Sequence, residues 1–120
     1  MIKRTLVIGA STNPSRYSYL AIQKLTTHGH TVVAIGNKEG EVSGVKISKE
    51  KVLFEDIDTI TLYLNRKNQV SYYDYILALN PKRVLFNPGT ENEELQKLLT
   101  KNNIAFEEAC TLVLLSTGEY

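Results

Sequence analysis

Small, polar and turn-forming residues follow the first apolar run of the chain. The run Leu6–Ile8 ends at Gly9-Ala10-Ser11-Thr12-Asn13-Pro14, and a helical pattern begins at Tyr17. Small residues let backbone N–H groups approach a negatively charged oxygen, and the start of a helix adds a favourable dipole. This order of strand, small-residue loop and helix start is typical of a phosphate-binding site. The alternative is a plain turn, because α/β proteins need turn residues in such places anyway.

Apolar runs and helical patterns alternate along the chain. Strands are predicted at residues 5–8, 31–35, 59–64, 83–86 and 104–106, with a further small strand at 45–47. Apolar residues at helical spacing predict helices over 17–25, 68–77 and 90–99, the last opened by a capping box at Thr90, and a final helical turn at 110–115. We expect one Rossmann-like α/β domain over residues 1–120. It has three layers, with helices on both faces of a five-stranded, mainly parallel sheet of order 3-2-1-4-5.

Four loops leave the carboxyl edge of such a sheet, where ligands bind beside the reversal of strand order. We expect that reversal between the first strand and the strand at 83–86. The loops span residues 9–16, 36–41, 65–68 and 87–90, and they are rich in Gly, Asn, Ser, Thr, Lys and Arg. This composition favours the capture of an anion.

The first two loops do not fit an ordinary NAD site. The motif Gly-x-Gly-x-x-Gly would need glycines at positions 9, 11 and 14, where Ser11 and Pro14 replace two of them. The acidic residue that usually binds the ribose hydroxyls after the second strand is also missing. Lys38 lies in that region instead and favours a phosphate, so NADP or another nucleotide stays open as an alternative.

Taken together, these motifs resemble one known family. The stretches Gly9-Ala10-Ser11-x-x-Pro14-x-Arg16, Gly36-Asn37-Lys38, Phe86-Asn87-Pro88-Gly89 and Glu108-Ala109-Cys110 look like the CoA-binding domain family. That family shares its fold with the CoA-binding part of the succinyl-CoA synthetase alpha subunit. The resemblance implies that the CoA diphosphate lies over the first loop and contacts Ser11, Asn13 and Arg16. It further implies that adenine and ribose lie near the second and third loops, with Lys38 free to meet a phosphate, and that residues 87–90 face the same cleft.

From the loops and the resemblance together, we expect a site for CoA or an acyl-CoA and no metal. The candidate ligand-binding residues are Gly9, Ala10, Ser11, Asn13, Pro14, Arg16, Tyr17, Gly36, Asn37, Lys38, Arg66, Asn87, Pro88 and Gly89.

Few other residues offer chemistry to this site. His28 and His30 flank Gly29, where the first helix ends, so both belong at the opposite edge of the sheet and no catalytic base is expected. Cys110 is either a buried small side chain or a thiol that meets the sulfur of CoA. Tyr72, Tyr73 and Tyr75 lie on one predicted helix, where they serve either the core or a subunit contact.

The composition excludes several function classes. A net charge of +1 over 120 residues gives no basic patch for nucleic acid, and no apolar run is long enough to span a membrane. The start of the chain lacks the pattern of a signal peptide, and the single cysteine leaves no internal disulfide, so we expect a cytoplasmic protein.

We therefore expect a single-domain protein that binds CoA or an acyl-CoA and has no catalytic activity of its own. Its partner is a small nucleotide ligand, not nucleic acid or a membrane, and a homo-oligomer stays open. Three alternatives remain. The chain could bind NADP or another nucleotide, it could be a subunit of an acyl-CoA ligase that depends on a partner for chemistry, or it could be an interaction domain with a vestigial cleft.

Overall fold

The computed structural model of this chain describes residues 2–120. Its centre is a seven-stranded sheet of order β3-β4-β2-β1-β5-β6-β7, in which β3 runs antiparallel to β4 and every other neighbouring pair is parallel. The strands are β1 (Thr5–Ala10), β2 (Val32–Gly36), β3 (Gly40–Val42), β4 (Val45–Ser48), β5 (Thr59–Leu62), β6 (Arg83–Phe86) and β7 (Ala105–Glu108).

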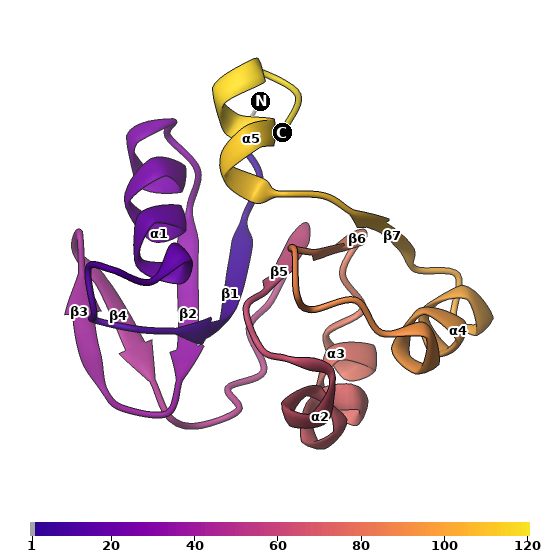
Figure 1. Cartoon of the computed structure of the whole chain (residues 1–120). Helices are drawn as coiled ribbons and strands as arrows, with labels where there is room; N and C mark the ends of the chain where they lie inside the picture. Colours follow the sequence, from indigo (N-terminus) through magenta and orange to yellow (C-terminus); the bar gives the residue numbers. More distant parts are fainter. Residues whose placement is uncertain (1) are drawn as a thin grey trace.

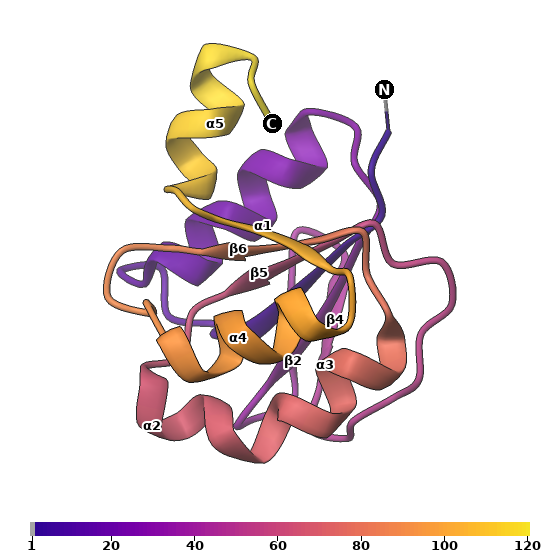
Figure 2. The same cartoon turned by 90° about the vertical axis from the view of Figure 1, so that its right-hand side faces the viewer.

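Helices cover both faces of the sheet and give three layers (Figures 1 and 2). Helices α1 (Tyr17–Thr27) and α5 (Thr111–Thr117) lie on one face. The other face carries α2 (Arg66–Gln69), the 3-10 helix η1 (Val70–Tyr72), α3 (Tyr73–Leu79) and α4 (Glu93–Lys101). The expected mixed α/β domain with a parallel-dominated sheet is confirmed.

Strand β1 supplies both halves of the core, because successive side chains of a strand point to opposite faces. Leu6 and Ile8 join the cluster under α3 and α4, whereas Val7 joins the cluster under α1 and α5. All three are completely buried. An apolar run without alternation is therefore what a strand covered by helices on both faces requires.

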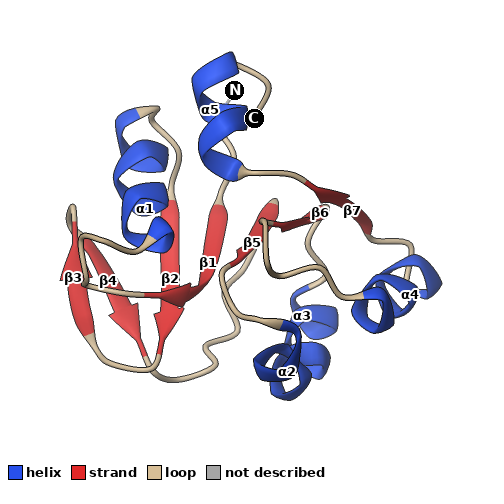
Figure 3. Ribbon diagram, viewed as in Figure 1, coloured by secondary structure: helices blue, strands red, loops and turns tan. Residues whose placement is uncertain are grey.

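The expected count of five strands and the expected order were wrong. The segment at 45–47 was predicted only as a small extra strand, yet β4 pairs in parallel with β2, next to which the order 3-2-1-4-5 had put residues 59–64. The chain leaves β2, forms β3 at the outer edge, and turns back through Ser43 and Gly44 to insert β4 between them (Figure 3). Strand β5 then pairs with the free side of β1.

This correction also moves the point at which the strand order reverses. From β1 the chain first builds outward through β2 to β4 and β3, and then returns to the other side of β1 with β5. The reversal thus lies between β1 and β5, not between β1 and the strand at 83–86 as expected. The loops that follow β1 and β5 are therefore the two loops that flank the point of reversal, where ligands bind in such sheets.

Several helix boundaries differ from the expected ones. The helix predicted at 68–77 is broken into α2, η1 and α3, and it begins earlier, where the Asn65 side chain accepts a hydrogen bond from the Asn68 N–H at 2.9 Å. The capping box at Thr90 does not form. Asn92 caps α4 instead, accepting from the Leu95 N–H at 3.2 Å, while the Thr90 hydroxyl donates to the Asn87 carbonyl at 2.7 Å. None of the described helices is long and apolar enough to cross a bilayer.

Candidate functional site

The first loop is held in shape by its own side chains. The Asn13 N–H donates to the Ser11 hydroxyl oxygen at 3.0 Å, and the Asn13 side-chain oxygen accepts from the Ser15 N–H at 3.0 Å and the Ser15 hydroxyl at 2.8 Å. A turn closes where the Arg16 N–H donates to the Asn13 carbonyl at 3.0 Å. These side-chain turns order the loop before any ligand arrives.

The start of α1 is left open to solvent. Arg16 is its N-cap residue, no side chain caps the helix, and no acidic residue lies in its first turn. The exposed residues here run from Thr12 to Tyr17. An 11-residue helix without a cap leaves backbone N–H groups and the positive end of its dipole available to an anion.

Two glycines let the neighbouring strands approach the first loop closely. At Gly9, which has φ of +92°, an added Cβ would lie 2.9 Å from the Tyr63 carbonyl group. At Gly36, a Cβ would lie 2.3 Å from the Ala10 carbonyl oxygen. Gly9 and Gly36 therefore serve backbone packing of β1 against its neighbours, and this packing fixes where the loop leaves the sheet.

The second loop lies beside the first. Ala10 pairs with Gly36 in the sheet, and an added Cβ at Gly40 would lie 2.5 Å from a methyl carbon of Thr12. Between these contacts, Asn37 and Lys38 are exposed. The structure therefore brings these two candidates to the same edge as the residues of the first loop.

The third loop is tied to the fourth by a buried amide. Gln69, which is completely buried, donates to the carbonyls of Leu64 at 2.8 Å and Thr90 at 2.7 Å. Its side-chain oxygen accepts from the Asn92 amide at 2.9 Å. Arg66 lies exposed in the first position of α2. The sequence analysis missed Gln69, since nothing local distinguishes it from an exposed helical glutamine.

In the fourth loop, Asn87 is committed to the fold. Its side chain is buried, donating to the Thr61 hydroxyl at 2.7 Å and the Leu62 carbonyl at 2.9 Å, and accepting from the Thr111 N–H at 2.9 Å. Within the fourth loop, residues 87–90, only Pro88 and Gly89 are exposed. A ligand at this loop would therefore meet Pro88 and Gly89, while Asn87 holds the loop from below.

An acidic side chain already covers the donor of the fourth loop. The Gly89 N–H donates to both carboxylate oxygens of Glu91, at 3.0 and 3.2 Å. The helix predicted over 90–99 would have included Glu91 in its first turn, but α4 begins at Glu93 and Glu91 bonds Gly89 instead. A carboxylate at this position disfavours a phosphate here, so the anion-binding capacity of the edge lies with the first loop.

Tyr63 and Cys110 lie where β5 and β7 lead into the edge. Burial raises the pKa of Tyr63 to about 12, with its hydroxyl near Thr61 and Thr111. Cys110 is the N-cap residue of α5 and is half-buried, not enclosed as a small core residue would be. Tyr63 stays protonated at neutral pH, so it can donate a hydrogen bond but cannot act as a base.

The cations of the first three loops are not neutralised by ion pairs. Among residues 2–120 the ion pair found joins Lys82 and Asp58 at 3.9 Å, far from this edge in the fold. Arg16, Lys38 and Arg66 are exposed, and no ion-pair partner is described for any of them. With Lys67, which is also exposed in the third loop, the edge presents four positive side chains and an open helix start, an arrangement suited to phosphate groups.

The opposite edge of the sheet holds the histidines. The Lys3 N–H donates to His30 Nδ1 at 3.0 Å, and the His30 ring packs on Tyr120 with centroids 4.9 Å apart. Arg83, at the start of β6, donates to the Thr59 hydroxyl at 2.8 Å and to the Tyr120 carbonyl at 2.9 Å. These residues close the amino edge and take no part in the candidate site, as expected for His30.

Two surface hollows lie elsewhere, on either side of α4. The larger, of about 870 Å³, is lined by Val70, Tyr73, Glu93, Glu94, Lys97, Leu98 and Lys101, and the smaller measures about 280 Å³. The larger hollow balances two carboxylates against two lysines, which does not suit a multiply charged phosphate ligand. In residues 2–120 no group of three or more His, Cys, Asp or Glu side chains is placed to hold a metal ion.

Solved structures share this fold along the full chain. One uncharacterized protein is 51% identical, with a TM-score of 0.97, and the match covers 100% of this chain and 99% of that chain. A hypothetical protein from Pyrococcus horikoshii OT3 has 24% identity and a TM-score of 0.87, covering 97% of this chain and 83% of its own. A protein from Thermus thermophilus has 22% identity and a TM-score of 0.87, covering 99% and 91%.

The sequence also matches a family model described as a CoA binding domain. The match runs over residues 3–116, which includes the four loops of the carboxyl edge and nearly the whole chain. A search of curated proteins found no match. On the extent of this match, the chain belongs to the CoA-binding domain family.

Proposed function

We propose that this protein binds CoA or an acyl-CoA at the carboxyl edge of its sheet. The diphosphate lies over residues 11–16, where the start of α1 supplies backbone donors and Arg16 supplies positive charge. Adenine and ribose lie along the second and third loops, so that Lys38 and Arg66 meet the remaining phosphate. The pantetheine arm passes the exposed Pro88 and Gly89.

One observation carries this proposal. The loop before α1 is shaped by the Ser11 and Asn13 side chains, yet the helix it leads into has neither a side-chain cap nor an acidic first turn. By contrast, α2 and α4 are capped by Asn65 and Asn92. Helix α5 also lacks a side-chain cap from its N-cap residue, but its first N–H, of Thr111, already donates to the Asn87 side chain. An ordered loop in front of an uncapped helix is what a bound diphosphate would complete.

We further propose that the isolated protein does not turn over thioesters. The histidines lie at the opposite edge, Tyr63 stays protonated, and the Glu91 carboxylate is bonded to Gly89. Hydrolysis or ligation would need groups from a partner subunit. Because CoA is an intracellular cofactor, the proposal places the protein in the cytoplasm.

Calorimetric titration with CoA, dephospho-CoA, NADP and NAD tests the proposal. We expect CoA to bind at about 1 μM or tighter, and NAD at least tenfold more weakly, a gap of about 1.4 kcal/mol or more. The affinity for dephospho-CoA should lie between those for CoA and NAD if Lys38 or Arg66 contacts the third phosphate. NADP is the second candidate because of Lys38, and tighter binding of NADP than CoA would replace the proposal with a dinucleotide site.

A further inference from the structure

Strand β7 leaves one edge of the sheet uncovered. It pairs with β6 on one side, and all four of its residues are exposed. Phe106 is 38% exposed although its ring packs edge-on against buried Phe86, with centroids 5.9 Å apart. An edge strand of this kind offers unpaired backbone groups to another strand.

The backbone direction of β7 shows which residues face outward. The Ala109 N–H donates to the Phe86 carbonyl at 3.1 Å, so Ala109 directs its backbone groups toward β6. Along a strand these groups alternate in direction, which gives Ala105 and Glu107 the same orientation as Ala109. The N–H and carbonyl groups of Phe106 and Glu108 therefore point away from the sheet, free to pair with a neighbour.

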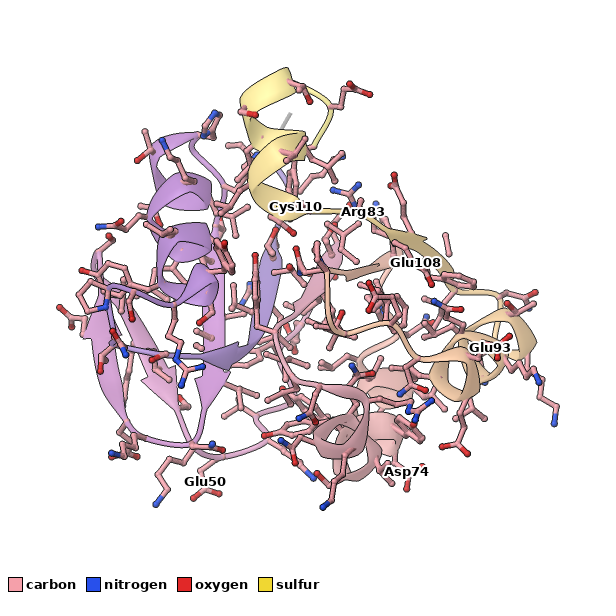
Figure 4. The ribbon with its side chains drawn as sticks, in the orientation of Figure 1. Glu50, Asp74, Arg83, Glu93, Glu108 and Cys110 are labelled. Atoms are coloured by element: carbon pink, nitrogen blue, oxygen red, sulfur yellow. The ribbon has the colours of Figure 1, made fainter. Side chains whose placement is uncertain are left out.

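Helix α4 flanks this edge with a charged surface of both signs. A hollow of about 280 Å³ is lined by Glu93, Gln96, Lys97, Thr100 and Phe106, so one side of α4 borders β7 (Figure 4). Glu93 and Lys97 are both exposed and lie one helical turn apart. A surface that carries one acid and one base in this order is complementary to itself after a two-fold rotation.

We propose that two copies of this chain join edge to edge through β7 and form one continuous sheet. A two-fold axis perpendicular to the sheet passes beside Phe106, so the two β7 strands pair antiparallel. Phe106 then forms a hydrogen-bonded pair with Phe106 of the second copy. Each ring packs into the hollow that α4 and Phe106 of the other copy line.

The acidic residues of β7 select this register over its neighbour. With Phe106 on the axis, Glu107 lies opposite Ala105 of the second copy, and no two carboxylates face each other. Moving the axis to Glu107 would place its carboxylate opposite the Glu107 carboxylate of the second copy, and like charges directly opposite each other destabilise a strand pair. Glu108 is drawn toward α4, where it accepts a hydrogen bond from the Gln96 amide at 2.9 Å.

The same axis sets the two α4 helices antiparallel across the interface. Glu93 of each copy then faces Lys97 of the other, which gives two symmetric ion pairs at the rim. The opposite edge of the sheet does not offer such a surface. Strand β3 has only three residues and starts at Gly40, against which Thr12 of the first loop packs.

Light scattering coupled to size-exclusion chromatography measures the assembly directly. We expect the protein to be a dimer at about 100 μM, well above the micromolar Kd of a modest interface. Phe106→Asp should give a monomer, because it places two like charges on the axis. Val113→Asp is the matched control, since Val113 is a 55%-exposed apolar residue of α5 on the other face, and it should stay dimeric. A wild-type monomer, or a dimer that persists in Phe106→Asp, overturns the proposal.

Cysteine cross-linking tests the register. In a Cys110→Ser background, Phe106→Cys should form an intermolecular disulfide under mild oxidation, because Cα atoms of a hydrogen-bonded antiparallel pair lie about 5.5 Å apart. Val113→Cys in the same background should not cross-link at the same rate. Equal cross-linking of both variants would mean random collision and would exclude a β7 interface.

Charge reversal supplies a variant that leaves the core untouched. Lys97→Glu should weaken dimerisation at least tenfold, because Glu93 then faces an acid in the second copy. The double variant Glu93→Lys with Lys97→Glu should recover most of this loss, since each pair is restored with its signs exchanged. A double variant no better than Lys97→Glu alone would contradict the proposed pairing. CoA titration of the same variants is independent, because neither residue belongs to the ligand edge.

Discussion

Polar residues at the carboxyl edge form two groups. One group is buried and hydrogen-bonded within the fold, and the other is exposed to solvent. Gln69 and Asn87 are buried with their amides bonded, so they fix the third and fourth loops. Arg16, Lys38 and Arg66 are exposed and have no ion-pair partner among the described residues. Substitution of the first group should therefore change stability, and substitution of the second should change binding.

Arg16→Ala should weaken CoA binding about tenfold or more, because a charge-assisted contact contributes roughly 1.5–3 kcal/mol. Its melting temperature should change little, since the side chain caps nothing. Lys24→Ala is the matched control, as Lys24 is an exposed cation at the other end of the same helix. Arg83 is unsuitable as that control because it bonds Thr59 and Tyr120. Equal CoA affinity in the Arg16 and Lys24 variants would show that the first loop is a plain turn.

Asn87→Ala should lower the free energy of unfolding by about 1–3 kcal/mol, because it leaves the buried Thr111 N–H and Leu62 carbonyl without this partner. Pro88→Ala, one residue further on and exposed, should stay within about 0.5 kcal/mol of the wild type. Urea denaturation of both variants gives the comparison. Similar stability of the two would show that the Asn87 amide contributes little.

Close strand packing at the element scale depends on Gly36. Gly36→Ala should cost about 1–3 kcal/mol, because the new Cβ meets a backbone oxygen of β1 that cannot move alone. Gly44→Ala, in the open turn between β3 and β4, should cost only about 1 kcal/mol from its positive φ. Thermal melts decide between them. A smaller loss of stability in Gly36→Ala than in Gly44→Ala would mean that β1 and β2 can move apart at this point without cost.

Local patterns in the sequence were enough to predict most elements but not their neighbours. The apolar run at β1 and the helical spacing at α1 indicate their own structure. The place of β4 does not follow from local pattern, since parallel neighbours usually need a helical crossover and here only the β3 excursion separates them. Sheet order is decided by pairing between distant segments, so the outer strands and the point of reversal were misplaced.

The sequence was enough to locate the loops of the candidate site, but not to show which of their side chains are buried and hydrogen-bonded within the fold. Gly, Ser and Asn after β1 mark a loop with exposed backbone, which the structure contains. The burial of Asn87 depends on Thr61 and Thr111, which lie 26 and 24 residues away. The bond from Gly89 to Glu91 depends on where α4 begins, and helix ends are the least certain feature of a sequence pattern.

At the scale of the whole molecule, stability should fall when the solution is acidified. Burial and the positive charges of His28, Lys3 and Arg83 lower the pKa of His30 from 6.5, and its Nδ1 must stay unprotonated to accept from Lys3. The unfolded chain therefore binds a proton first as pH falls below 6.5, and stability is lost from there down to the folded pKa. His30 joins the segments that lead into β1 and β2 and the C-terminal Tyr120, so the loss is global.

Melting temperatures at about pH 7.5 and 5.5 measure the effect, above the range in which carboxylates titrate. His30→Gln should show a smaller fall than the wild type over this interval. His28→Gln is the control and should keep most of the fall, because it removes only one of the charges that act on His30 and leaves the burial of His30 unchanged. An unchanged fall in His30→Gln would exclude His30 as the responsible group.

The central place of β1 has a consequence for synthesis of the chain. The strands β1 to β4 can pair once residue 48 has left the ribosome, but the free side of β1 waits for β5, which ends at residue 62. At about 5–20 residues per second, those 14 further residues take roughly one to three seconds. During this interval a nascent chain exposes one edge of its central strand, so contacts with other nascent chains or with chaperones should concentrate on β1.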